Sequence, residues 1–209
     1  MARINQIVQM VRVVSLMLFA FLPLTGMTQG RAKALLGKRD DQAIVIYAGA
    51  GISQFTGDAG TPAGLNAVID RSHISGSLRI MWHPGYLLRI GVETGFLHFY
   101  SYRVESGGTR GNTEVRAIPL LFVFSMPVGN RIHLYTGAGS YLMTTWIDYR
   151  SNVKSTSSTL GWMFAANFLQ PITRRLGVVA EGKWMDAGST RDAALSLQVG
   201  LRWRISKWR

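Results

Sequence analysis

The chain has 209 residues, with 23 Lys and Arg against 11 Asp and Glu, a formal net charge of +12 and no cysteine. The lack of cysteine excludes a disulfide framework and a thiolate metal site, and the basic balance makes anionic surfaces the first candidate partners. Nucleic acid is disfavoured as that partner, because the basic residues form no Lys/Arg run and no nucleic-acid-binding motif. A membrane rich in anionic lipid is a simpler explanation of the positive net charge than nucleic acid is.

The N-terminus has the pattern of a secretory signal peptide. Arg3 and Arg12 precede an apolar run over 13–24, and small and polar residues follow it. About a dozen apolar residues is too short for a membrane anchor, and no later segment offers the roughly 18 that a transmembrane helix needs. The sequence therefore predicts a signal peptide over 1–29, a basic lead over 30–42 and one β-barrel domain over 43–209.

Segments that alternate apolar and polar residues fill the rest of the chain. The last segment shows the pattern most clearly, because apolar residues recur at every second position from Leu195 to Ile205. A strand of about ten residues with this period crosses a bilayer only inside a closed barrel, since every backbone N–H and C=O needs a partner in lipid. The expected strands cover 43–55, 72–82, 86–102, 114–126, 131–147, 159–169, 176–185 and 195–206.

The connectors alternate between long and tight. Long polar connectors over 56–71, 103–113 and 148–158 follow the first, third and fifth strands, and tight turns follow the second, fourth and sixth. Outer-membrane barrels alternate in this way because their short turns face the periplasm and their long loops face outside. The sequence thus predicts an all-β, eight-stranded antiparallel up-and-down transmembrane β-barrel in the cell outer membrane, too narrow for an open pore.

A soluble lipocalin-like barrel has the same strand count but an apolar lumen. Here the polar face is rich in glycine and carries charges of both signs, which can pair inside a barrel. Aromatic residues near both ends of the apolar face, Trp82 and Trp146 among them, suit the two membrane interfaces. We therefore expect a structural network inside the lumen formed by Arg79, Arg89, Glu93, Glu181, Lys183, Arg202 and Arg204.

Several short segments carry a resemblance to a known family. They are Ala117–Phe122, Pro127–Gly129, Leu134–Gly139, Val179–Trp184 and Leu197–Arg202. Together they resemble the outer-membrane protein β-barrel domain family, including PorT-like and OmpX-like small barrels. The resemblance implies the fold and the location and says little about function.

Catalytic and metal sites find weak support in the sequence. His73 and Ser75 lie two residues apart on one expected strand and Glu93 on its neighbour, and some outer-membrane lipid A deacylases use a Ser/His/Glu constellation. A bare His-x-Ser is better explained by an interior hydrogen-bond network. The four histidines are scattered, with no spacing that resembles a metal-ligand set. We expect no catalytic, cofactor or metal residues.

The predicted function is that of a small non-enzymatic outer-membrane barrel. Charged side chains would plug its lumen, and the external loops 56–71, 103–113 and 148–158 would serve surface interaction or envelope integrity. Expected partners are outer-membrane lipid, lipopolysaccharide and a protein bound by the loops or within an envelope complex. The alternatives are an accessory subunit of an envelope or secretion assembly, a lipid A-modifying hydrolase and a soluble lipocalin-like binding barrel.

Overall fold

The computed structural model describes residues 42–57, 67–84, 87–106, 109–149, 151–188 and 192–208. The chain divides into two units, Met1–Asp40 and Asp41–Arg209. The expected signal peptide over 1–29 and all but the last residue of the basic lead lie outside the described residues. The described part contains no helix of the length and hydropathy that crossing a membrane requires.

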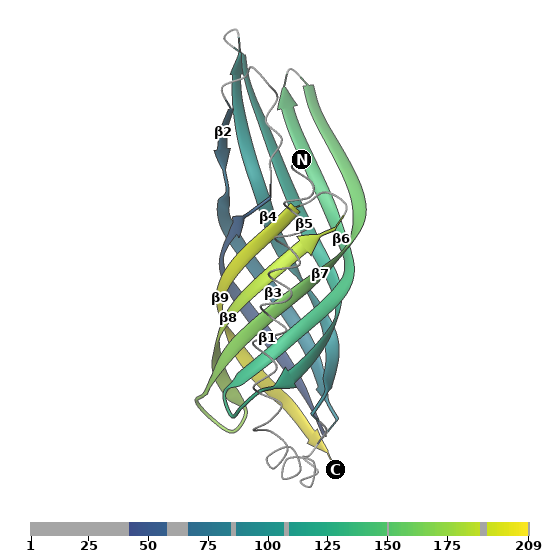
Figure 1. The fold of residues 1–209 in the computed structure, drawn as a ribbon, viewed down its shortest axis with the longest axis vertical. Helices are drawn as coiled ribbons and strands as arrows, with labels where there is room; N and C mark the ends of the chain where they lie inside the picture. The colour runs from purple at the N-terminus through teal and green to yellow at the C-terminus, as the bar shows by residue number, and fades with distance from the viewer. Residues whose placement is uncertain are drawn as a thin grey trace, which may run out of the picture. The chain divides into compact units, whose positions relative to one another are not determined.

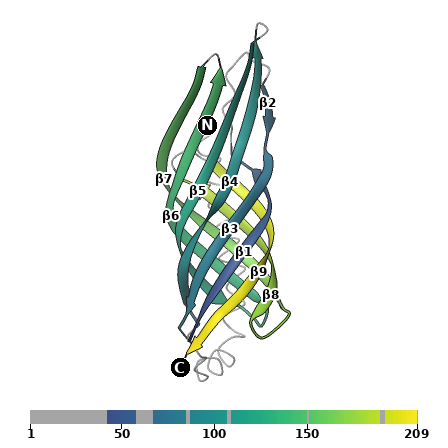
Figure 2. The ribbon, with the colours of Figure 1, turned by 180° about the vertical axis from the view of Figure 1, so that it is seen from behind.

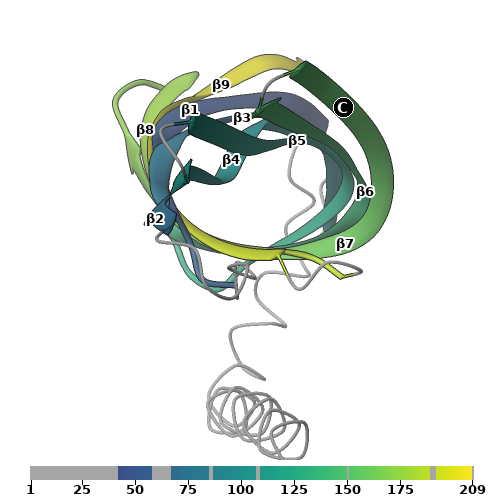
Figure 3. The ribbon, with the colours of Figure 1, turned by 90° about the horizontal axis from the view of Figure 1, so that it is seen from above.

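The described chain is built from antiparallel strands. They are β1 (Gln42–Phe55), β2 (Ala67–Asp70), β3 (Ser72–His83), β4 (Arg89–Ser106), β5 (Thr109–Pro127), β6 (Ile132–Tyr149), β7 (Ser151–Pro171), β8 (Leu176–Ala187) and β9 (Asp192–Trp208). Their order in the sheet is β2-β4-β3-β1-β9-β8-β7-β6-β5, and β4 also pairs with β5. That last pairing closes eight strands into a ring, which Figure 3 shows from above. The predicted up-and-down barrel is confirmed.

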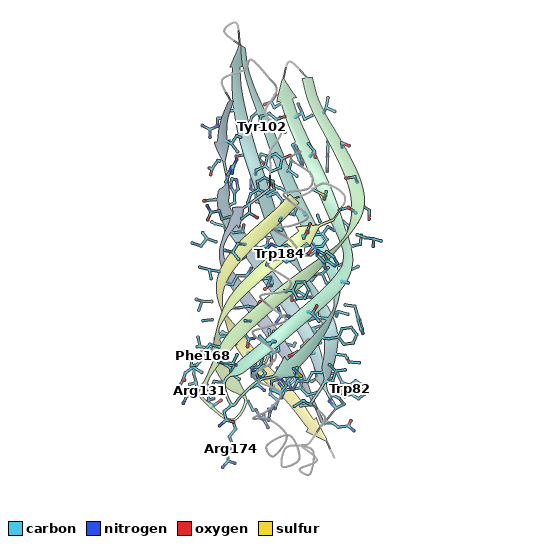
Figure 4. The ribbon with its side chains drawn as sticks, in the orientation of Figure 1. Trp82, Tyr102, Arg131, Phe168, Arg174 and Trp184 are labelled. Atoms are coloured by element: carbon cyan, nitrogen blue, oxygen red, sulfur yellow. The ribbon has the colours of Figure 1, made fainter. Side chains whose placement is uncertain are left out.

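The outer face of the ring is apolar. Exposed large hydrophobic residues recur at every second position of the strands, and Leu160, Ile74 and Val199 are 77%, 69% and 64% exposed. A soluble barrel would not leave so much contiguous apolar surface in water. Trp82 and Phe168 lie at the end of this belt where β3 and β7 finish (Figure 4), as expected for one interfacial girdle. We call this end, with the tight turns after β3, β5 and β7, the turn end.

The inner face is packed with side chains. Met81, Leu121, Val123 and Met163 are buried beside the polar residues of the lumen. Glycine lets β1 and β9 approach closely, because a Cβ on Gly200 would lie 2.7 Å from the Cα of Gly49 and would also collide with the carbonyl oxygen of Ala48. The glycine-rich polar face is therefore the cramped interior that the sequence indicates.

Two of the predicted external loops are strands. Residues 103–106 and 109–113 extend β4 and β5, and 151–158 extend β7. Figures 1 and 2 show β4 to β7 reaching beyond β1, β3, β8 and β9 at the end opposite the turns, which we call the loop end. The expectation of loops was wrong because water covers both faces of a strand beyond the membrane, so no apolar alternation marks it.

The third expected loop, 56–71, also contains a strand that the sequence did not predict. The short strand β2 pairs with β4, so that Asp70 lies opposite Ser101 and Ala67 opposite Val104. It stands directly before β3, from which only Arg71 separates it. The remainder of this expected loop, 58–66, lies outside the described residues.

Two side chains depart from strict alternation along their strands. Alternation from Phe96 would place Tyr100 on the lipid face, but an irregularity in the β4–β5 register between His98 and Tyr100 shifts the strand by one residue. Tyr100 then packs on the buried Phe55, with ring centroids 4.8 Å apart. A bulge inverts the side-chain alternation beyond it, and the sequence gives no signal for it. Alternation counted back from His133 would place Arg131 inside the barrel, but it is exposed in the turn before β6.

Candidate functional site

Four charged side chains meet in the middle of the lumen. Arg79 of β3 stands beside Glu93 of β4 in the sheet register, and its Nε donates a hydrogen bond to Glu93 Oε2 at 2.5 Å. Its two terminal nitrogens reach across the lumen to β8 and donate to both oxygens of Glu181, at 2.9 and 3.0 Å. Lys183 of β8 donates to Glu93 and lies 3.1 Å from Glu181 Oε1.

This cluster, which we call the lumen network, is buried. The side chains of Arg79, Glu93, Glu181 and Lys183 are 2%, 2%, 8% and 1% exposed. Two cations face two anions, so the formal charges of the network cancel. A buried charge is tolerated only when it is paired and hydrogen-bonded, and each of these four has at least two charged partners.

Aromatic and amide groups hold Arg79 in place. Its guanidinium carbon lies 4.1 Å from the ring centroid of Tyr135 and 5.8 Å from that of Tyr47, within reach of cation–π attraction. Asn167 donates to the Tyr135 hydroxyl at 3.0 Å and approaches Glu181 Oε2 at 3.5 Å. These contacts link β1, β6, β7 and β8 to the network, so strands all around the ring fix its geometry.

The other three residues expected in the network lie elsewhere. Arg89, Arg202 and Arg204 are near the turn end, where Arg89 stands opposite Ser125 and Arg204 opposite Val45 in the sheet register. Their charges act on His83, which is buried at the same end. The sequence pattern placed all seven residues on the inner face. Their positions along the barrel axis, which distinguish the lumen network from this second, basic group, follow only from the strand register.

The Ser/His/Glu constellation of the alternative hydrolase function does not assemble among the described residues. Ser75 shares a hydrogen bond of 2.9 Å with Ser196 and accepts one of 3.2 Å from Gln198. His73 instead stacks on His98, with centroids 3.7 Å apart, and its Nε2 lies 3.1 Å from the carbonyl oxygen of Asp70. A nucleophile needs a base within hydrogen-bond reach, and the described contacts give Ser75 none. The described residues also hold no group of three or more His, Asp or Glu that could bind a metal.

The loop end carries a second candidate site, an open strand edge. β6 and β7 pair along their full length, from Ile132 opposite Phe168 to Tyr149 opposite Ser151. On its other side β7 pairs with β8 only from Trp162 onward. Within the described ranges no strand covers that side of residues 153–158, and all six of their side chains are exposed. We call this segment the β7 edge.

Main-chain groups of the β7 edge point towards the open side. The carbonyl oxygen of Leu160 accepts a hydrogen bond of 3.1 Å from the N–H of Gly188, which fixes the direction of the Leu160 main chain. In a strand this direction alternates from one residue to the next, so Lys154, Thr156 and Ser158 present their N–H and C=O groups to the same open side. An edge of this kind is a template for pairing with another strand.

Comparison with known proteins supports the fold. No protein-family model matches the chain, and no curated protein matches it. Among solved structures, the attachment invasion locus protein Ail of Yersinia pestis aligns with 79% of this chain and 99% of its own, at 12% identity and a TM-score of 0.52. Neisserial surface protein A aligns at 17% identity and a TM-score of 0.44, over 78% and 97% of the two chains. OprG of Pseudomonas aeruginosa aligns at 14% identity and 0.45, over 80% and 97%.

The fold and the lipid-facing surface together indicate where in the cell this protein is located. Ail shares its fold with this chain, and Ail is an outer membrane protein. A closed ring of strands with an apolar outer belt satisfies its backbone hydrogen bonds internally, as a membrane requires. The chain is an all-β outer-membrane β-barrel, and its location is the cell outer membrane.

Proposed function

We propose that this chain is a non-enzymatic outer-membrane barrel that binds an extended segment of a partner protein along the β7 edge. The observation that carries the proposal is the exposed side of residues 153–158, which pair with β6 on their other side and which no second strand covers among the described residues. Adding a strand to such an edge gains main-chain hydrogen bonds without demanding a specific side-chain pocket. The function therefore resides in a strand rather than in the predicted loops.

The side chains of the β7 edge define the chemistry of that partner. The Lys154 ammonium lies 5.1 Å from the ring centroid of Trp146 on one face of the edge. Val153 and its register partner Ile147 are exposed on the other face, at 53% and 40%. A matching strand would place an acidic side chain near Lys154 and an apolar side chain against Val153, since side chains on paired strands meet across the sheet.

A proline substitution tests the main-chain part of the proposal. Thr156→Pro removes an N–H from the open side of β7 but none from the β6 side, whereas Thr156→Ala keeps that N–H. A partner that the wild-type protein retains on intact cells should be lost from Thr156→Pro and kept by Thr156→Ala. Both variants should show the heat-modifiable gel migration of a folded barrel. Equal retention by the two variants would refute strand addition at this edge.

The lumen network supports a second part of the proposal, namely that the barrel has no open pore. Side chains fill the lumen around Arg79, and the cavity beside it has a volume of only about 20 Å³, enough for a single water molecule. We propose that the network plugs the lumen and that the protein conducts no ions. In planar bilayers the wild-type barrel should show no stable channel, and a stable open conductance would contradict the plug.

An accessory role in an envelope assembly remains the second candidate, on the resemblance to PorT-like barrels. The exposed β7 edge would serve such an assembly equally well if the partner strand came from an envelope protein. Stable co-purification of an envelope protein with wild-type barrel and with Thr156→Ala, but not with Thr156→Pro, would favour this role. Retention of only an external protein would favour surface interaction.

A further inference from the structure

Two histidine side chains stack on each other at the loop end of the barrel. The rings of His73 on β3 and His98 on β4 lie with their centroids 3.7 Å apart and are 8° from parallel. The pairing of β3 with β4 ends at Gly76 and Phe96, before it reaches either histidine. Ring stacking therefore joins the two strands where their main-chain pairing has stopped. We call these two residues the histidine pair.

The histidine pair also contacts β2. The Nε2 atom of His73 lies 3.1 Å from the carbonyl oxygen of Asp70, the last residue of β2. Beyond this point β2 takes the place of β3 beside β4, as Figure 1 shows, but the two strands pair over only four residues, 67–70 opposite 101–104. Such a short strand has few hydrogen bonds of its own, so its position depends on the contacts around it.

A second proton on the histidine pair is unfavourable. Two imidazolium rings 3.7 Å apart repel each other, because like charges at this distance interact strongly wherever water is partly excluded. In addition, Nε2 of His98 is enclosed and has no hydrogen-bond partner among the described residues. A proton on this atom would create a charged N–H donor without an acceptor. When the rings separate, water surrounds both, and each can take a proton near the ordinary histidine pKa of about 6.5.

The charged side chains around the histidine pair come from β2 and β5. The charges of Asp70, Glu114 and Arg116 act on His98. Glu114 and Arg116 pair with each other at 2.6 Å, so their effects on the pair largely oppose each other. Arg116 stands opposite His98 in the register and is 58% exposed, which places this level of β4 in water beyond the apolar belt. Protons from the external solution can therefore reach the histidine pair.

The remaining neighbours supply little negative charge. The Oδ1 atom of Asp70 accepts a hydrogen bond of 3.2 Å from the N–H of Ser72, and Asp70 is exposed, so water and salt screen its charge. Arg71, between β2 and β3, is also exposed and carries the opposite charge. The hydroxyl of Ser53 on β1 donates to the carbonyl oxygens of both histidines, and β1 contains no charged residue. Two imidazolium rings would thus lack the counter-charge that they need.

We propose that the histidine pair is a pH-sensitive switch that holds β2 against β4 at neutral pH and releases it in acid. The released form binds more protons than the stacked form, so its population must rise as the pH falls below about 6.5. The increase is up to about tenfold per pH unit for each additional proton that the released form binds.

Release of β2 uncovers a second strand edge. In the extension formed by β2, β4, β5, β6 and β7, the strands β2 and β7 lie at the two borders. Without β2, residues 101–104 of β4 would present the N–H and C=O groups that now pair with 67–70. Such an edge can bind an extended segment of another chain. The switch thus makes a binding surface depend on pH, and the proposed function at the β7 edge does not depend on it.

Hydrogen–deuterium exchange of the folded barrel in maltoside detergent tests the switch. Exchange is measured by mass spectrometry at pH 7.5 and 5.0, with labelling times corrected for the pH dependence of intrinsic amide exchange. In the wild type, the protection of amides in 67–73 should fall about tenfold or more between the two pH values. The amides of β8 should keep their protection, because the barrel itself stays closed.

His98→Phe is the matched variant, because it keeps a stacked aromatic ring but has no site for a proton. Its protection over 67–73 should change less than about twofold between the two pH values, since no second charge can form on the pair. Protection that is independent of pH in the wild type would refute the proposal. So would an equal loss of protection in the wild type and in His98→Phe, because another group would then control β2.

Asp70→Asn covers the case in which His98→Phe does not fold. Asparagine keeps an oxygen that accepts from Ser72 but removes the negative charge, so a second proton becomes less favourable and release of β2 should shift to higher pH. An unchanged pH midpoint of release, or a shift to lower pH, would contradict the switch. Loss of protection in β8 together with 67–73 would also contradict it, because acid would then be opening the whole barrel. Heat-modifiable gel migration checks that each variant is folded.

Discussion

Arg79 binds both carboxylate oxygens of Glu181 across the lumen, joining β3 to β8 through two hydrogen bonds of 2.9 and 3.0 Å. β3 and β8 are not neighbours in the sheet, because β1 and β9 lie between them. The pair therefore braces opposite walls of the ring. It also keeps Arg79 close to Glu93, whose other oxygen accepts from Lys183.

Removing Glu181 should destabilise the barrel strongly. Glu181→Ala leaves Arg79 and Lys183 with one carboxylate between them inside the lumen, and breaking a buried pair in this way costs about 3–5 kcal/mol. The change should appear as a lower denaturant midpoint of unfolding in detergent. Glu114→Ala is the matched control, because Glu114 and its partner Arg116 are 28% and 58% exposed and such a pair contributes at most about 1 kcal/mol. An unchanged midpoint for Glu181→Ala would contradict a stabilising network.

The sequence predicted the part of the fold that lipid surrounds. Between the interfaces one face of each strand meets hydrocarbon and the other meets the lumen, so apolar and polar residues must alternate. Val199 and Gln198 show the outcome, since the first is exposed to lipid and the second buried inside. Where β4 to β7 extend beyond the membrane this constraint ends, and the Ser/Thr-rich run 153–158 has the composition of a loop.

The candidate sites were predictable only in part. Alternation places Arg79, Glu93, Glu181 and Lys183 on the inner face, but which of them meet depends on the stagger between strands. Arg79 is adjacent to Glu93 in the register, whereas Glu181 reaches it from across the ring. The β7 edge could not be read from sequence, because it exists only where β8 ends before β7 does.

Gly200 should tolerate no larger side chain. A Cβ at this position would lie 2.7 Å from the Cα of Gly49, its register partner on the neighbouring strand β1. Gly200→Val forces the two strands apart and should cost about 1–3 kcal/mol or prevent closure. Gly182→Ala provides the control, because its Cβ would meet only Leu197 Cδ2 at 3.7 Å. That variant should be as stable as the wild type or slightly more stable. Heat-modifiable migration reports closure, and equal migration and stability of both variants would argue against tight packing at Gly200.

A charge in the middle of the apolar belt should be costly. Ala138 faces outward on β6, flanked in the register by Phe122 of β5 and Trp162 of β7, both exposed. Ala138→Arg should lower the free energy of unfolding in lipid vesicles by about 2–4 kcal/mol, as arginine does near a bilayer midplane. The same change at exposed Asn112, on the part of β5 beyond the belt, should have little effect. Similar losses at both positions would mean that the belt lies elsewhere.

Ser75→Ala should leave lipid A unchanged when the protein is expressed in a Gram-negative host. Ser75 is bonded to Ser196 and Gln198, and the nearest histidine in sequence, His73, is stacked on His98 instead. Without a base to take its proton, the hydroxyl is no nucleophile at neutral pH. Mass spectrometry of extracted lipid A should give the same acyl pattern for wild type, Ser75→Ala and a host without the barrel. Loss of acyl chains with the wild type alone would establish a hydrolase. Loss with both proteins would place an activity at a residue other than Ser75.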